Sequence, residues 1–133
     1  MSDVLADAHT ALWHLFDPAR LSVTAKGALA RATQSGGLIQ VSAITPIEVR
    51  YLVEKSKIPL SHWTGLLAAL LDPQVPVNVL PIDLAVAQAV ERIPRAIVPD
   101  MPDRIIAATS LLHNLPLVTA DRKLQAAPIQ TIW

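Results

Sequence analysis

Cysteine is absent from the 133-residue sequence. Disulfide bonds, thiolate metal sites and cysteine nucleophiles are therefore excluded, and nothing indicates an oxidising compartment. Aromatic residues are few, with three Trp, one Phe and one Tyr. The Trp residues lie too far apart in the sequence to form a base-stacking platform, so we expect them in the core or in an interface.

The sequence has no excess of charge of either sign, because 11 Lys and Arg residues balance 11 Asp and Glu residues. It therefore lacks the overall basic field that is typical of nucleic-acid-binding proteins. Long hydrophobic runs are missing, since Leu66 to Leu71 falls far short of the roughly 18 residues that suggest a membrane span. The N-terminal residues do not resemble a signal peptide. We expect a soluble, cytoplasmic protein.

Hydrophobic residues make up 52% of the sequence and charged residues 17%, which predicts a single domain over residues 1–133. Short β-like runs alternate with longer helical patterns, an order typical of an α/β fold around a mostly parallel sheet of four to five strands. We expect strands at residues 4–6, 38–41, 76–80, 117–119 and 129–132. Helices are expected at residues 8–16, 23–33, 63–71, 84–92 and 101–113, with one more that begins at Pro46.

Two of these helices carry clear signals at their ends. Thr45 and Glu48 have the spacing of a capping box, with Pro46 at the first helical position. The Gly36-Gly37 pair is expected to end the helix at residues 23–33, because glycine readily adopts the backbone conformation that follows a helix.

Four acidic residues lie at or just after the expected ends of strands or starts of helices: Asp7, Glu48, Asp103 and Asp121. In open α/β sheets, ligands bind beyond the carboxyl ends of the strands. If the strands are parallel neighbours, the four carboxylates converge there. Two carboxylates about 4 Å apart repel by about 4 kcal/mol at an effective dielectric constant of about 20, so the cluster should raise some of its pKa values or bind a cation. Oxygen ligands alone favour Mg²⁺ or Mn²⁺ over zinc.

Each of these acids also fits an ordinary role at a helix start, where carboxylates accept hydrogen bonds from free amides. Asp7 and Asp121 fit N-caps, Glu48 fits the third helical position, and Asp100 fits an N-cap with Asp103 at the third position of the same helix. Asp83 shows the same local pattern. We assign Asp83 to capping alone, because the strand before it contains proline and is expected at an edge of the sheet.

The sequence resembles the PIN domain, in particular the small VapC-type toxins of prokaryotic toxin-antitoxin pairs. The resemblance covers nearly the whole chain and depends on five segments in the correct order and spacing. No single segment is specific. The segments are residues 4–9, 41–48, 93–94, 100–108 and 117–121.

This resemblance implies a three-layer α/β/α fold and a Mg²⁺- or Mn²⁺-dependent endoribonuclease that cleaves RNA and inhibits translation. The family's catalytic and metal-binding acids correspond to Asp7, Glu48, Asp103 and Asp121. We expect Asp7 and Asp103 to be the principal metal ligands, with Glu48 and Asp121 serving a second ion directly or through water. The implied partners are a VapB-like antitoxin, whose tail covers the acidic crevice, and a second copy of the chain in a homodimer.

Two alternatives from other functional classes remain. One is a catalytically silent PIN-like module that only binds partners. The other is a receiver-type signalling domain, which needs an adjacent acidic pair after the first strand and a lysine after the last. The sequence has neither, since Asp7 stands between Ala6 and Ala8.

Several polar residues near the acids also have candidate roles. We expect Arg104 to pair with a neighbouring acid rather than to bind phosphate. Ser42 and Thr119 are expected to bond backbone groups. His9 lies nearest to the acids, but the four His residues lack the paired spacing of a zinc site. The leucine-rich segment at residues 66–71 is expected to contact a partner.

Overall fold

The computed structural model describes residues 2–133 and contains one sheet of five parallel strands in the order β3-β2-β1-β4-β5. The predicted α/β fold with a mostly parallel sheet is confirmed. The strands are β1 (Val4–Ala6), β2 (Ile39–Ser42), β3 (Val77–Leu80), β4 (Leu117–Val118) and β5 (Thr131–Ile132). The helices are α1 (Ala8–Phe16), α2 (Val23–Gln34), α3 (Ile44–Glu54), α4 (Leu60–Leu71), α5 (Leu84–Ala89), α6 (Met101–His113) and α7 (Arg122–Gln125), with 3₁₀ turns η1 (Pro18–Arg20) and η2 (Val90–Arg92).

β1 lies at the centre of the sheet because all of its side chains are hydrophobic, as is typical of parallel strands covered on both faces. It pairs with β2 through the register Val4 to Ile39 and with β4 through the register Leu5 to Leu117. β3 occupies one edge of the sheet. This position confirms the prediction made from the proline that precedes it.

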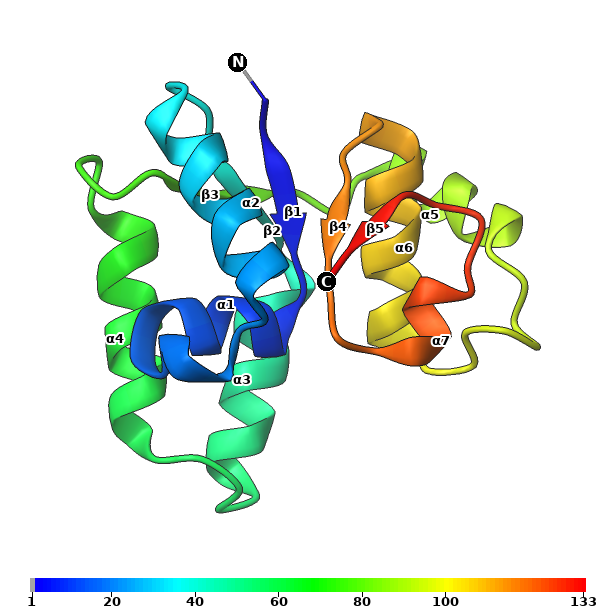
Figure 1. Ribbon diagram of the computed structural model, residues 1–133. Coiled ribbons are helices and arrows are strands. Elements are labelled where there is room, and N and C mark those ends of the chain that lie inside the picture. The colour runs from blue at the N-terminus through cyan, green and yellow to red at the C-terminus, as the bar shows by residue number, and fades with distance from the viewer. Residues whose placement is uncertain (1) are drawn as a thin grey trace.

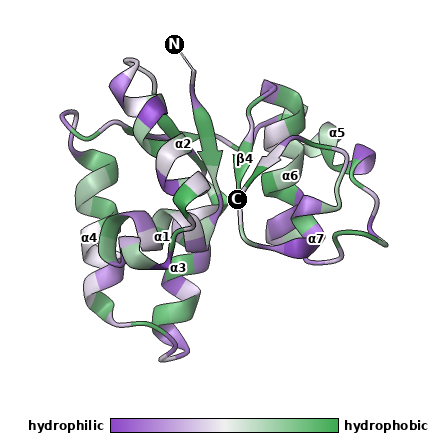
Figure 2. Cartoon of the chain, in the orientation of Figure 1, coloured by the Kyte–Doolittle hydropathy of each residue, from purple (hydrophilic) through white to green (hydrophobic). Residues whose placement is uncertain are grey.

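Helices cover both faces of the sheet, with α1, α2 and α4 on one side and α5 to α7 on the other, while α3 extends beyond the end of β2 and contacts α1, α4 and α6 (Figure 1). Successive residues of β1 point to opposite faces. Val4 and Ala6 belong to the core that includes Leu29 of α2, whereas Leu5 belongs to the core that includes Ile106 of α6. Figure 2 shows β1 as mainly hydrophobic and the outer helix surfaces as mixed with hydrophilic residues. The three-layer arrangement is confirmed.

A smaller core joins α1, α3 and α4 beside the sheet. Leu12, Val49 and Leu66 are its buried residues, one from each helix. α4 approaches α1 closely at Gly65, where an added Cβ atom would lie 2.6 Å from Cε1 of the Phe16 ring. A residue without a side chain is therefore needed at this contact.

The predicted capping box at the start of α3 does not form. The helix begins at Ile44 rather than at Pro46, and its first residues receive no side-chain cap. The backbone is already helical at Ala43, so Thr45 becomes an interior residue whose buried Oγ1 atom has no hydrogen-bond partner in the part of the chain that the structure describes. The tight connection from β2 leaves no extended residue that could act as an N-cap.

Two further helix boundaries differ from the prediction. α4 begins at Leu60 instead of residue 63, because Pro59 precedes the helix as an extended residue. α5 ends at Ala89 and passes into a 3₁₀ turn. By contrast, Gly36 follows α2 with φ of 83°, which confirms the predicted helix end. Between residues 2 and 133, no helix has both the length and the hydropathy needed to cross a membrane.

Candidate functional site

Acidic side chains gather at one edge of the sheet, where β2, β1 and β4 lie side by side and end together. Each of these strands leads into a helix that starts at this edge, and α6 begins there too. The carboxylates line one cavity of about 560 Å³. The structure therefore brings together all four acids expected from the sequence and adds a fifth; the five are Asp7, Glu48, Asp100, Asp103 and Asp121.

Asp7 follows β1 directly and is 6% exposed. Its Oδ1 atom accepts a hydrogen bond of 2.9 Å from the backbone N–H of Thr10, so the predicted N-cap of α1 is confirmed. Its Oδ2 atom accepts a hydrogen bond from the hydroxyl of Thr119. A carboxylate offers about four lone-pair positions, so Asp7 retains acceptor capacity toward the cavity while both oxygens are held in place.

Glu48 has no capping role. Its carboxylate accepts no hydrogen bond from the start of α3, and its buried Oε1 atom has no hydrogen-bond partner among residues 2–133. An unpaired buried carboxylate oxygen is costly, because it has lost water without gaining another donor. The local pattern that suggested an ordinary cap therefore does not account for this residue.

Asp100 and Asp103 belong to the first turn of α6. Asp100 is the N-cap and accepts a hydrogen bond of 3.1 Å from the N–H of Asp103, as predicted. Oxygen atoms of Glu48, Asp100 and Asp103 all lie within 4.8 Å of one another. Such a set of hard oxygen ligands is the kind that binds Mg²⁺ or Mn²⁺.

Mutual repulsion and burial change the acidity of two of these groups. Burial raises the pKa of Glu48 to about 7, with further contributions from the charges of Asp103, Asp100 and Asp7. Burial also raises the pKa of Asp103 to about 7, with further contributions from the charges of Asp100, Asp121 and Asp7. The shared causes indicate that the carboxylates act on one another across the cavity.

No basic side chain among residues 2–133 offsets this negative charge through a close ion pair. Arg50 and Glu54 form the one ion pair within 4.0 Å that the described part of the chain contains, and both lie outside the cavity. Arg122 and Lys123 line the cavity at its rim and are exposed. The arrangement can therefore hold a divalent cation at its centre and attract an anion at its edge.

Thr119 connects two of the acids. Besides donating to Asp7, its Oγ1 atom accepts a hydrogen bond of 3.0 Å from the N–H of Asp121. The expected bond to a backbone group is confirmed at the N–H of Asp121, and the structure adds the bond to the Asp7 carboxylate, because the pairing of β4 with β1 brings the Thr119 hydroxyl against Asp7. Asp121 caps α7 through Oδ1, which accepts from the N–H groups of Lys123 and Leu124.

Arg104 has a different role from the predicted ion pair, and this expectation is wrong. Its guanidinium donates to the backbone carbonyls of Ile93 and Val90 at 3.0 and 3.1 Å, which joins α6 to η2. Ser42 accepts a hydrogen bond from the N–H of Ile44, which confirms its backbone role.

Asp83 caps α5 through a hydrogen bond of 3.0 Å from the N–H of Val86, and it lies beyond edge strand β3. It does not line the acidic cavity. Its assignment to capping alone is therefore confirmed. Asp100 is the cavity residue that sequence reasoning treated only as a cap; the signal was its position three residues before Asp103 at the start of the same helix.

Comparison with known proteins agrees with this geometry. The chain matches the PIN domain over residues 4–129. It is 33% identical over 141 aligned positions to Ribonuclease VapC22 of Mycobacterium tuberculosis (strain ATCC 25618 / H37Rv), with 100% of each chain covered. The fold is similar to that of VapBC2 from Rickettsia felis bound to a promoter DNA fragment, with a TM-score of 0.72, 16% identity, and 97% of this chain and 96% of that chain covered. For FitAcB from Neisseria gonorrhoeae, the TM-score is 0.55 and the identity 21%, with 96% and 95% covered. From this match and this identity, we conclude that the chain belongs to the PIN domain family.

Proposed function

We propose that this protein is an endoribonuclease that depends on Mg²⁺ or Mn²⁺ and acts as the toxin of a type II toxin-antitoxin pair, cleaving RNA and thereby inhibiting translation. The observation that carries this proposal is the Oε1 atom of Glu48, which is buried without a hydrogen-bond partner within residues 2–133 and belongs to a carboxylate that shares one cavity with other carboxylates. The full-length similarity to a protein named as a ribonuclease supports the same function.

The acidic cavity fits a hard divalent cation. All of its candidate ligands are carboxylate oxygens, and no close ion pair neutralises them within the described residues. We assign Asp7, Glu48, Asp103 and Asp121 as the metal-binding and catalytic acids, with Asp100 as an additional ligand. A bound divalent ion would neutralise phosphate charge and lower the pKa of a coordinated water molecule.

The protein's own groups would then orient the reactants. Asp7 is held rigidly by Thr10 and Thr119, so its position changes little when substrate binds. In the metal-free protein, burial and the charges of the neighbouring acids raise the pKa of Glu48 to about 7, so a cation bound beside this carboxylate would favour its ionised form. Arg122 and Lys123 at the rim would attract the RNA backbone, which explains how a chain with zero net charge binds a polyanion.

An antitoxin and a second copy of the chain are the proposed protein partners. The solved relatives VapBC2 and FitAcB suggest the antitoxin. Of the leucine-rich segment expected at a partner contact, Leu66 is buried in the core, while Leu71 is 79% exposed and accessible to a partner. Ile47 and Tyr51 of α3 are also exposed, and they line a groove beside the acids.

Asp7→Asn tests the proposed function. Asn keeps the shape of Asp and an oxygen for the N-cap, but it removes the charge that would face the cation. We expect cleavage of RNA to fall about 100-fold or more, similar to the roughly 10²–10³ losses seen when one electrostatic group is removed from an active site. The measurement is the rate of RNA cleavage by purified protein in Mg²⁺ or Mn²⁺, with new RNA ends mapped after expression in cells.

Asp83→Asn is the matched control, because Asp83 also caps a helix but lies outside the cavity. It should retain the wild-type rate and wild-type growth arrest. If wild-type protein cleaves no RNA, or if Asp7→Asn cleaves as fast as Asp83→Asn, the nuclease assignment is wrong. The catalytically silent PIN-like binding module would then be the better description.

A further inference from the structure

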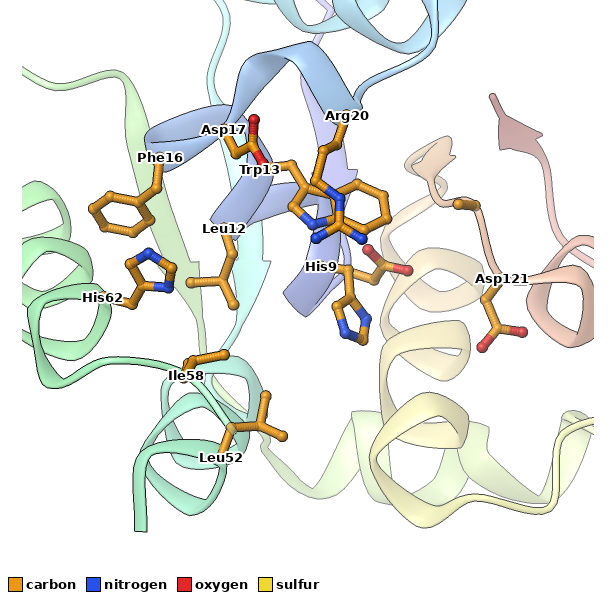
Figure 3. A pocket seen from close by; sticks show the side chains of 12 residues that line it. His9, Leu12, Trp13, Phe16, Asp17, Arg20, Leu52, Ile58, His62 and Asp121 are labelled. Carbon is orange, nitrogen blue, oxygen red and sulfur yellow. The ribbon is translucent and has the colours of Figure 1, made fainter. Parts of the chain in front are cut away.

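A second cavity of about 400 Å³ adjoins the acidic one and shares three lining residues with it, namely Asp7, His9 and Asp121. Its remaining walls come from α1, η1, the end of α3 and the start of α4 (Figure 3). This volume lies in the range of roughly 300–1,000 Å³ that is usual for small-molecule sites. A group bound here would sit directly beside whatever the acidic cavity holds.

The two halves of this cavity differ in chemistry. On one side, Leu12, Leu52 and Ile58 form a hydrophobic wall. Next to them, the rings of Phe16 and His62 stack at 4.5 Å with an interplanar angle of 15°. Flat hydrophobic and aromatic walls of this kind accept the face of a nucleobase.

The other side carries a cation. The Arg20 guanidinium lies over the Trp13 ring, 4.7 Å from its centroid, and Figure 3 shows both side chains near His9. Trp13 is itself held between neighbours, with its ring centroid 5.6 Å from that of His9 and 5.8 Å from that of Trp133. Arg20 is an exposed residue, and the Trp13 ring gives its guanidinium a support at the surface through the attraction between a cation and an aromatic face.

Arg20 makes no ion pair within 4.0 Å with any carboxylate in residues 2–133. Its five N–H donors thus remain available, in a planar fork that matches the oxygen atoms of a phosphate. A cation next to an aromatic and hydrophobic wall suits a nucleotide, which combines a phosphate with a base. A hydrophobic peptide would use the wall but would leave the cation without a partner.

We propose that this cavity binds one nucleotide of the RNA next to the cleaved phosphate, with its base against the hydrophobic wall and its phosphate on Arg20. Arg20 then positions the substrate and takes no part in the chemical step. This inference rests on the proposed ribonuclease function, because the shared residues Asp7 and Asp121 connect the cavity to the acids.

The test compares steady-state cleavage of single-stranded RNA by Arg20→Ala and Arg31→Ala. Arg31 is an exposed residue of α2 and lines a different cavity together with Asp3, so its removal changes net charge equally but leaves this site intact. We expect Arg20→Ala to raise KM about tenfold, as for loss of a charged hydrogen bond, with little change in kcat. The logarithm of the RNA-binding constant decreases with the logarithm of the salt concentration, and the steepness of this decrease should be smaller by about 0.7 in Arg20→Ala. Arg31→Ala should have the KM and salt dependence of the wild type. Arg20→Lys should have a KM between that of the wild type and that of Arg20→Ala.

Ile58→Trp tests the base-binding half, because the larger side chain takes up space beside the hydrophobic wall of the cavity. It should alter the preferred nucleotide beside the cleavage point, whereas Arg20→Ala should lower affinity without altering that preference. Thermal melting of each variant verifies that it folds.

The results separate this inference from the function on which it rests. A wild-type protein that cleaves no RNA overturns the proposed function. If the wild-type protein cleaves RNA but the Arg20→Ala and Ile58→Trp variants have unchanged KM and unchanged nucleotide preference, only the nucleotide site is overturned. If those variants instead weaken inhibition by an antitoxin alone, the cavity is a protein-binding groove and the nucleotide assignment is wrong.

Discussion

At the scale of single residues, the acids of the site combine two roles that the sequence presents as alternatives. Asp7 caps α1 and also faces the acidic cavity, and Asp121 likewise caps α7 while lining the cavity. A helix start is a natural place for a carboxylate that must be held rigidly, because backbone N–H groups fix one oxygen and leave other lone pairs available. Among residues 2–133, the carboxylates of Glu48 and Asp103 accept no such bond from a backbone N–H.

The Thr119 hydroxyl is a residue-scale feature whose loss can be tested. Thr119→Val keeps the shape of the side chain but leaves Asp7 Oδ2 without its donor and the N–H of Asp121 without its acceptor. We expect the free energy of unfolding to fall by about 1–3 kcal/mol, the usual cost of buried groups that lose a partner. RNA cleavage should also slow, because Asp7 is no longer held in position.

Urea denaturation and cleavage rates measure both effects. Thr119→Ser is the control, since Ser retains the hydroxyl and should recover most of the activity. If Thr119→Val is as stable and as active as the wild type, the hydrogen bond between Thr119 and Asp7 does not support the site.

At the scale of secondary-structure elements, the packing of α4 against α1 depends on Gly65. A Cβ atom there would lie 2.6 Å from the Phe16 ring, which is itself stacked on His62. Gly27 in α2 offers a contrast, because its added Cβ would come near only the flexible end of Arg31, at 3.0 Å. One glycine is required by a contact between helices, and the other is not.

Gly65→Ala should therefore destabilise the protein by about 1–3 kcal/mol, the usual cost of overpacking. Gly27→Ala should stabilise it by about 0.4–1 kcal/mol, because alanine restricts the unfolded chain and the side chain of Arg31 can move aside. Thermal or urea unfolding of both variants measures whether the two substitutions change the free energy of unfolding in opposite directions. Equal effects of the two substitutions would show that α1 and α4 are not closely packed at residue 65.

At the scale of the whole molecule, the acidic cavity exists because α3 and α6, which are distant in the sequence, start at the same sheet edge. The pKa values of Glu48 and Asp103 are raised to about 7, above their ordinary values of 4.5 and 3.8. Between pH 4 and pH 7, approximately, the folded protein therefore keeps protons that the unfolded chain has released. Raising the pH through this window should lower the free energy of unfolding of the metal-free protein, and this loss of stability should be complete above about pH 7.

This pH dependence is measured by urea denaturation in EDTA at several pH values, with the Glu48→Gln and Asp103→Asn double variant as the reference. The wild type should lose stability relative to the double variant as the pH rises, since the variant has no charge to bury at these positions. Adding Mg²⁺ or Mn²⁺ at pH 7.5 should raise the wild-type Tm more than that of the variant. Parallel pH curves for the two proteins would contradict the mutual repulsion of these carboxylates.

Much of the fold was predictable from the sequence because its signals are local. The all-hydrophobic Val4–Ala6 segment predicted a strand, and the proline before β3 predicted an edge position. The four expected acids were also correctly located at one sheet edge, because strand ends and helix starts can be recognised along the chain. The start of α3 was mispredicted, since the Thr45-Pro46-Ile47-Glu48 pattern resembles a cap equally well whether or not an extended residue precedes it.

By itself, the sequence determined which segments become strands and helices and which acids stand at their junctions. Only the tertiary structure decided that Thr119 donates to Asp7, that Arg104 bonds the backbone of η2, and that Arg20 lies over Trp13. These contacts join residues whose separation along the chain carries no local signal, and parallel strand pairing and helix packing bring them together. For the same reason, only the folded protein buries the Oε1 atom of Glu48, near the start of α3, and leaves it without a hydrogen-bond partner among residues 2–133.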